Sequence, residues 1–119
     1  PAASLLGPGD QAVLPALVED GAHRTNLGIA SLASVDTTIR VSVRSEDGAP
    51  LGDLDVVVPA GALVQLDRVL SSSLAFTGRA WALLSSSDAE ARYAAYASVV
   101  DEGTGDPVVL PAVGVTAAR

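Results

Sequence analysis

The stretch TTIRVSVRSEDGAPLGDLDVVV, residues 37–58, decides the fold of this chain. Apolar and polar side chains alternate along residues 37–45, which is the period of a strand with one buried and one wet face. Residues 46–50 (EDGAP) have turn chemistry. The same period returns over residues 53–58, where Leu54, Val56 and Val58 alternate with Asp53 and Asp55. The stretch therefore predicts two strands of an antiparallel sheet.

Further short strands are expected on both sides, separated by Gly, Pro and Asp. They cover residues 12–18, 25–32, 63–66, 78–85, 92–101 and 107–113. Regular short strands with such breaks favour an all-β antiparallel sandwich or barrel. Between Leu66 and Leu74 the apolar spacing changes to that of a helix face, which predicts one or two helical turns capped by Asp67 or by the serines.

Residues 86–100 fit two interpretations. Their alanines, and the capping-box spacing of Ser87 and Glu90, favour a helix. The β-rich flanks favour a strand over residues 92–101 that pairs with residues 78–85 and then returns through residues 107–113. We prefer the strand, because helix propensity is weak against tertiary context.

The segments AVLPALV (12–18) and VVLPAVG (108–114) are near copies of each other. Proline lacks the N–H donor that a central strand needs. Pro15 and Pro111 therefore predict that the first and last strands both lie at sheet edges.

Composition sets the limits on function. The chain has 119 residues, which is the size of one domain, and we expect an extension at 1–10, the sandwich at 11–114 and a tail at 115–119. It has no cysteine, which excludes thiol catalysis, cysteine-based zinc sites and disulfides. A net charge of −7 with scattered arginines argues against nucleic acid as a partner.

No apolar stretch approaches the roughly 20 residues of a membrane span, so no membrane insertion is expected. No signal peptide is visible, and the start at Pro1 without any methionine is expected of a processed chain.

The acidic tip DEGTGD, residues 101–106, is the main candidate site. Asp101, Glu102, Thr104 and Asp106 offer oxygen ligands for a hard cation such as calcium, although their spacing is not that of an EF-hand. The preferred interpretation is a turn between two strands, in which Gly103 and Gly105 take positive φ and Asp106 binds its own backbone before Pro107. We therefore expect no bound metal and a larger structural role for the glycines than for the carboxylates.

Arg24 is expected to pair with Asp101 or Asp106 and so to fix this hairpin against the second strand. His23 is the only histidine, and no G-x-S-x-G or phosphate-binding glycine motif occurs. No enzymatic activity and no cofactor are therefore expected. The four aromatic residues, Phe76, Trp81, Tyr93 and Tyr96, are expected to fill the core, with Trp81 supplying volume to an alanine-rich interior.

Four segments together resemble a module that recurs in exported bacterial proteins: HRTNLGIASLAS, TTIRVSVRSEDGAPLG, VPAGALVQLDRVL and YASVVDEGTGDPVVLPA. The similarity covers residues 13–112 and is most specific in the tail motif Y-A-S-V-V-D-x-x-T-G-D-P. Ala30-Ser31-Leu32-Ala33 departs from the aromatic or Asn-Pro that the module often carries there.

The resemblance implies an immunoglobulin-like sandwich of about seven or eight strands, used as an accessory domain of secreted or cell-surface proteins. It brings no catalytic residues. We therefore expect a non-catalytic structural or interaction module for a protein partner or a second copy of itself. The alternative is a ligand-binding module for carbohydrate or a divalent cation, using the acidic tip or an exposed face with Trp81 and Tyr96.

Overall fold

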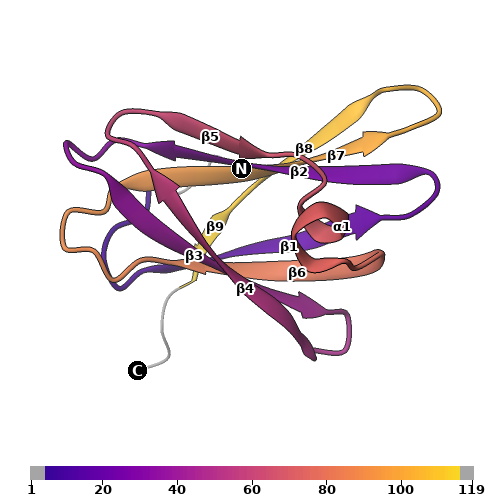
Figure 1. Ribbon diagram of the computed structural model, residues 1–119, viewed down its shortest axis with the longest axis horizontal. Coiled ribbons are helices and arrows are strands. Elements are labelled where there is room, and N and C mark those ends of the chain that lie inside the picture. Colours follow the sequence, from indigo (N-terminus) through magenta and orange to yellow (C-terminus); the bar gives the residue numbers. More distant parts are fainter. Residues whose placement is uncertain (1–4, 116–119) are drawn as a thin grey trace.

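Alternating side chains along nearly every strand build two antiparallel sheets that pack face to face. The computed structural model describes residues 5–115 and has nine strands and one short helix (Figure 1). These are β1 (Gln11–Glu19), β2 (His23–Ser31), β3 (Thr37–Ser45), β4 (Pro50–Val58), β5 (Leu63–Leu66), α1 (Val69–Leu74), β6 (Gly78–Ser85), β7 (Tyr93–Asp101), β8 (Pro107–Pro111) and β9 (Val113–Val115). The expected all-β sandwich is confirmed, with nine strands instead of seven or eight.

The sheets have the strand orders β4-β3-β6-β1-β9 and β5-β2-β7-β8. Immunoglobulin-like sandwiches place strands A, B, E and D in one sheet and C, F and G in the other. Here β1, β6 and β3 take the places of B, E and D, while β2, β7 and β8 take those of C, F and G. The C-terminal β9 lies beside β1, where strand A lies in that scheme. The immunoglobulin-like order is therefore reached with a different edge strand.

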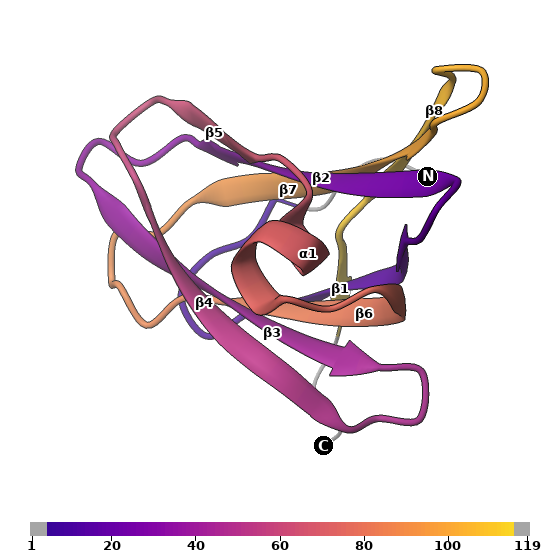
Figure 2. The same ribbon diagram turned by 45° about the vertical axis from the view of Figure 1, so that its right-hand side comes forward.

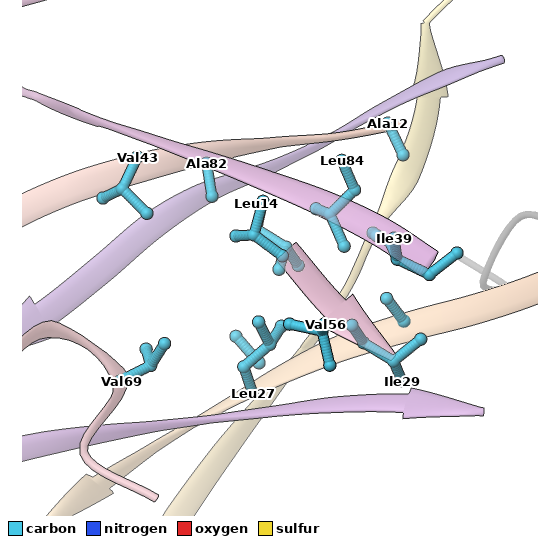
Figure 3. Packing of buried hydrophobic residues seen from close by; sticks show 14 of the residues in the cluster. Ala12, Leu14, Leu27, Ile29, Ile39, Val43, Val56, Val69, Ala82 and Leu84 are labelled. Carbon is cyan, nitrogen blue, oxygen red and sulfur yellow. The ribbon is translucent and has the colours of Figure 1, made fainter. Parts of the chain in front are cut away.

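The core lies between the sheets and consists mainly of small and β-branched side chains. Figure 3 shows Leu14, Leu84 and Ile39 from the five-stranded sheet directed toward Leu27 and Ile29 from the four-stranded sheet. All five side chains are buried. Burial of this kind stabilises by roughly 25 cal/mol per Å² of apolar surface removed from water. Interdigitated Leu, Ile and Val therefore carry the fold without disulfides.

The ninth strand arises because the chain changes sheets at Ala112. Residues 107–113 were expected to form one strand, but β8 pairs with β7 and ends at Pro111. The Ala112 N–H still donates to Ala95 O at 2.9 Å. One residue later Val113 pairs with Val13 of β1 in the other sheet. A bend at Ala112, which is small and buried, therefore divides the apolar segment that was expected to form one strand into β8 and β9.

Residues 93–101 form a strand, as preferred over the helix, but the expected pairing of β6 with β7 is wrong. Strand β6 pairs with β1 and β3, whereas β7 pairs with β2 and β8. The connection between them crosses from one sheet to the other. It is held at the start of β3, where Ser86 Oγ donates to Thr38 O at 2.7 Å and the Thr38 N–H donates to Asp88 Oδ2 at 2.6 Å.

The expected equivalence of the two proline-containing strands at sheet edges also fails for the first of them. Strand β1 lies inside its sheet, between β6 and β9. Its pairing with β9 stops at Val13, and its register with β6 shifts between Leu14 and Leu17. Pro15 therefore lies in a β-bulge, where the ladder requires no N–H from it.

The short helix α1 lies on the open side between the two sheets, as Figure 2 shows, and contacts β1, β2 and β4. Its position agrees with the expected helical turn, but neither Asp67 nor a serine caps it. Glu19, at the end of β1, accepts hydrogen bonds from the Leu70 and Ser71 N–H groups at 2.7 and 3.1 Å. Its Oε1 also accepts from Ser71 Oγ at 2.6 Å. A buried carboxylate from another element therefore satisfies the first turn.

Ordered packing extends into the segment expected as an N-terminal extension. Leu6 is buried, and it exchanges backbone hydrogen bonds with Tyr93 at 2.8 and 3.0 Å. Residues 1–4 of the expected extension and 116–119 of the expected tail lie outside the described residues. Within residues 5–115, no helix has the length and apolarity needed to cross a membrane.

Candidate functional site

The acidic hairpin between β7 and β8 is a tight turn whose polar groups bind one another. Asp101 Oδ1 accepts hydrogen bonds from the Gly103 and Thr104 N–H groups at 2.8 and 3.2 Å. The Asp106 N–H donates to Thr104 Oγ1 at 3.2 Å. Asp101, not Asp106 as expected, therefore supplies the side chain that closes the turn on its own backbone.

Only one of the two glycines has the predicted conformation. Gly105 has a φ of 76°, whereas Gly103 is not among the residues with positive φ. The Gly105 N–H donates to Asp101 O at 2.7 Å, and the Asp101 N–H donates to Asp106 O at 3.0 Å. The turn therefore requires a left-handed residue at position 105 alone, two residues before the strand that begins at Pro107.

Arg24 holds the hairpin through Glu102, not through Asp101 or Asp106 as expected. Arg24 Nη1 lies 2.9 Å from Glu102 Oε2, and Arg68 Nη2 lies 3.1 Å from Glu102 Oε1. The Glu102 N–H also donates to Ala22 O at 2.7 Å. Glu102 thus joins the hairpin to β2, to the β1–β2 turn and to the residue that precedes α1. Glu102 is therefore the carboxylate of the hairpin that forms ion pairs with two arginines.

The hairpin does not assemble a cation cage. Glu102 is neutralised by two guanidinium groups, and Asp101 Oδ1 is occupied by backbone donors. Across residues 5–115, no three side chains among His, Asp and Glu lie close enough to hold a metal ion.

His23, the single histidine, pairs with Asp20 in the turn between β1 and β2, where its Nδ1 lies 3.1 Å from Asp20 Oδ1. The Ala22 N–H hydrogen bond is the main reason that the pKa of Asp20 lies below its usual value.

An open depression of ≈ 360 Å³ lies on the five-stranded sheet and is lined by Thr38, Arg40, Asp55, Ser85, Ser86 and Ser87. Arg40 donates to both oxygens of Asp55, at 3.0 and 3.2 Å, and lies 3.8 Å from Asp53. Arg40 accordingly lowers the pKa of Asp55. Two carboxylates compensate the charge that would attract an anion, so this depression is poorly suited to bind one.

The aromatic residues divide between the core and the two outer faces. Tyr93 is buried, and Phe76 packs against the core. Trp81, expected to be buried, lies half-buried on the outer face of the five-stranded sheet, where its Nε1 donates to Ser45 O at 3.0 Å and Arg44 lies 5.9 Å from its ring centroid. Tyr96 was also expected in the core, but it lies on the outer face of the other sheet, because it alternates with the buried Ala95 and Ala97. The two rings are on opposite sides of the sandwich and share no binding face.

The outer face of the four-stranded sheet is almost without charge. Burial alternates along β2 except at Gly28 and along β7 as far as Ser98, and cross-strand register then identifies the residues of the outer face, including Val100, which is itself buried. From β5 to β8 these form the rows Leu63–Ala30–Ala94, Gln65–Gly28–Tyr96–Pro111, Asn26–Ser98–Val109 and Arg24–Val100–Pro107. Arg24, the one charged member, is paired with Glu102 at the end of the face.

This distribution is unusual for a chain with 21 charged residues, the sum of 7 basic and 14 acidic side chains. The outer face of the other sheet carries Arg40, Arg44, Asp53, Asp55 and Arg79. On the uncharged side Leu63 and Val109 are 57% and 59% exposed. In Figures 1 and 2 no described helix or strand covers this face.

Tyr96 lies across the middle of the uncharged face. Its ring extends from β7 over Gly28 of β2, and its hydroxyl reaches Gln65 of β5 at 3.4 Å. A β-carbon at position 28 would overlap the Cε1 and Cζ atoms of the ring. Glycine at this position therefore lets one aromatic ring lie along the sheet. Sequence patterning gave no sign of this arrangement, because it depends on the register between β2 and β7.

Comparison with known proteins gives the fold and no function. No protein-family model and no curated protein matches the chain. Among solved structures, the crystal structure of Thermotoga maritima 1070 matches with a TM-score of 0.68 and 14% identity over 92% of this chain and 96% of that one. The crystal structure of FlgD from P. aeruginosa matches with a TM-score of 0.37 and 16% identity over 93% and 74%. At 14% identity the first similarity supports the sandwich fold alone.

Proposed function

We propose that this domain is a non-catalytic interaction module of a secreted or cell-surface bacterial protein. In this proposal it binds through the uncharged outer face of the four-stranded sheet, defined by Leu63, Ala30, Ala94, Tyr96, Pro111, Gln65, Gly28, Asn26, Ser98 and Val109. The observation that supports the proposal is the contrast between the two outer faces. Charges that keep an acidic domain soluble are placed on one face and are missing from the other.

The polar clusters elsewhere support a non-catalytic role. Glu102 is held by two arginines, Arg40 by Asp55, and His23 by Asp20. General acid–base chemistry needs a positioned group within reach of a substrate and free to exchange a proton. These groups are instead engaged in fixing turns and strands. The location in a secreted or surface protein rests on the sequence resemblance alone.

A charge placed on the uncharged face tests the proposal. Ala94→Glu puts one carboxylate between Ala30 and Tyr96, and Gln11→Glu puts the same charge on the outer face of the other sheet as a matched control. Binding to isolated bacterial envelope material is measured by co-sedimentation, after circular dichroism has shown that both variants are folded. We expect Ala94→Glu to lose retention and Gln11→Glu to keep it. Equal retention of the two variants would contradict the proposal, as would turnover in an assay of hydrolase substrates.

A further inference from the structure

We infer that the uncharged face is a binding site for a neutral saccharide chain, centred on Tyr96. This inference rests on the proposed function and names the chemistry of the ligand at the same face. Three observations carry it: the position of the Tyr96 ring, the uncharged polar groups around it and the size of the face.

The Tyr96 ring is held in place before any ligand arrives. It covers Gly28, its hydroxyl reaches Gln65, and it lies in the middle row of the face. One side of the ring covers the backbone of β2, which leaves the other side directed away from the sheet. A sugar ring presents an apolar C–H face with hydroxyls at its rim, and an aromatic ring offers a flat apolar surface with which that face can stack.

The polar groups next to Tyr96 are amides and hydroxyls. Gln65 lies in the same row, and Asn26 and Ser98 form an adjacent pair in the next row. Asn26 Oδ1 accepts a hydrogen bond from the Arg68 N–H at 3.0 Å, which orients the side chain and leaves its NH₂ group as the donor. Amides and hydroxyls supply both donors and acceptors, which is what sugar hydroxyls require. No member of these three rows is charged, and the one carboxylate at their border, Asp67, already accepts a hydrogen bond from Gln65 Nε2 at 3.0 Å.

The size of the face separates a saccharide from a second copy of the chain. The three uncharged rows hold ten residues, and a spacing of about 4.8 Å between strands and about 6.8 Å along them gives roughly 330 Å². A stable protein interface needs about 800 Å² from each partner. The uncharged area is therefore less than half of what each partner of a stable dimer would bury, whereas it accommodates a short run of sugar units.

The experiment is a titration of the ¹⁵N-labelled domain with cellohexaose and with chitohexaose, followed by amide chemical shifts, with oligogalacturonate as an acidic probe. We expect saturable shifts around Tyr96, Gly28 and Ser98 with at least one neutral probe, and much weaker shifts with oligogalacturonate. Tyr96→Ala should weaken binding about tenfold or more, whereas Tyr96→Phe should stay within about threefold because the ring remains. Trp81→Ala, on the opposite face, should leave the affinity unchanged.

Two results would overturn the inference: no saturable shift with either neutral probe, or shifts that centre on Trp81 and vanish in Trp81→Ala. If the neutral probes fail while Ala94→Glu still abolishes envelope retention, the interaction module stands and the saccharide assignment falls. If Ala94→Glu keeps envelope retention and the neutral probes also fail, both proposals fall.

Discussion

The ring of Tyr96 occupies the space in which residue 28 would carry a β-carbon, and Gly28 leaves that space open. Gly28 does not have positive φ, so its backbone conformation suits any residue. The requirement for glycine at this position therefore comes from contact with one side chain. The effect of a side chain at position 28 should therefore depend on whether residue 96 is tyrosine, and mutation of both residues can test this.

Gly28→Ala should destabilise the domain by about 1–3 kcal/mol, because the ring must leave its position or the strands must shift. In a Tyr96→Ala background the same change should be neutral or slightly stabilising, since alanine suits a strand at least as well as glycine. A double-mutant cycle by urea unfolding measures this coupling. Additive effects of the two substitutions would show that the contact carries no energy.

Glu19→Gln should cost about 1–3 kcal/mol. The carboxylate is 3% exposed and accepts from two N–H groups and one hydroxyl. An amide in its place presents N–H to at least one of these donors and leaves a buried group without a partner. Thermal unfolding compares it with Glu90→Gln on the exposed Glu90, where we expect a change within about 0.5 kcal/mol. Equal midpoints for the two variants would refute a capping role for Glu19.

A structural feature of this domain could be predicted from the sequence when the residues that determine it lie close together in the chain. The period-2 pattern of residues 37–45 and 53–58 is local, and those strands form as predicted. The cap of α1 comes from Glu19, which precedes its partner Leu70 by 51 residues, so no sequence window contains both. The sheet to which β6 and β7 belong is likewise a matter of long-range pairing.

Trp81 shows a second limit. Strand β6 is apolar on both faces, with Ala80, Ala82 and Leu84 buried and Trp81 and Leu83 on the outside. A period-2 pattern cannot assign the faces when both are apolar. Side-chain volume then favours a buried tryptophan, which was the wrong choice here. The inner face takes the alanines because the opposite sheet already supplies Leu27, Ile29 and Tyr93.

At the acidic hairpin, position 105 should be more sensitive than position 103. Gly105→Ala places a β-carbon at a φ of 76°, which costs about 1 kcal/mol or more, whereas Gly103→Ala meets ordinary φ and only a close approach to Asp101 Oδ1. Unfolding midpoints of the two alanine variants test the difference. A larger loss at position 103 would show that the Asp101 contact, and not the backbone angle, governs the turn.

Tyr93→Phe should leave stability at neutral pH nearly unchanged. Tyr93 is fully buried, and its hydroxyl has no hydrogen-bond partner among the described residues. Removing an unpaired buried polar group loses no hydrogen bond. A loss above about 1 kcal/mol in urea unfolding at pH 7 would mean that the hydroxyl has a partner in solution.

The same substitution should protect the domain against alkali. Burial, with a smaller contribution from the charge of Asp10, raises the pKa of Tyr93 to about 12. In the unfolded chain this phenol ionises near pH 10, so above pH 10 the folded state retains a proton that the unfolded state releases. Wild-type stability should therefore fall between pH 10 and pH 12, by about 2 kcal/mol at pH 12 relative to Tyr93→Phe. Urea unfolding of the wild type and of Tyr93→Phe at a series of pH values measures this difference. If the free energy of unfolding falls equally in both proteins above pH 10, Tyr93 does not control the loss of stability in alkali.

The final prediction concerns the free edge of strand β8. The hydrogen bonds Asp101 N–H to Asp106 O and Ala112 N–H to Ala95 O fix which residues of β8 face β7. Antiparallel pairs alternate, so Val108 and Leu110 direct their backbone groups toward β7, and Pro107, Val109 and Pro111 direct theirs away from the sheet. Two of these three outward positions are proline and have no N–H to offer. An edge with exposed valines is thereby protected against strand addition.

Changing both prolines to valine should therefore let this edge pair with the same edge of another molecule, so that the domain self-associates. The Pro107→Val, Pro111→Val double variant restores two outward donors beside Val108 and Val109, which are 60% and 59% exposed. Sedimentation velocity over a concentration series should show association well beyond that of the wild type. Pro59→Val, the same replacement in the β4–β5 turn, is the matched control and should not associate. If the double variant sediments like the control, the prolines serve the turn and the change of sheets at Ala112, and protection of the edge comes from elsewhere.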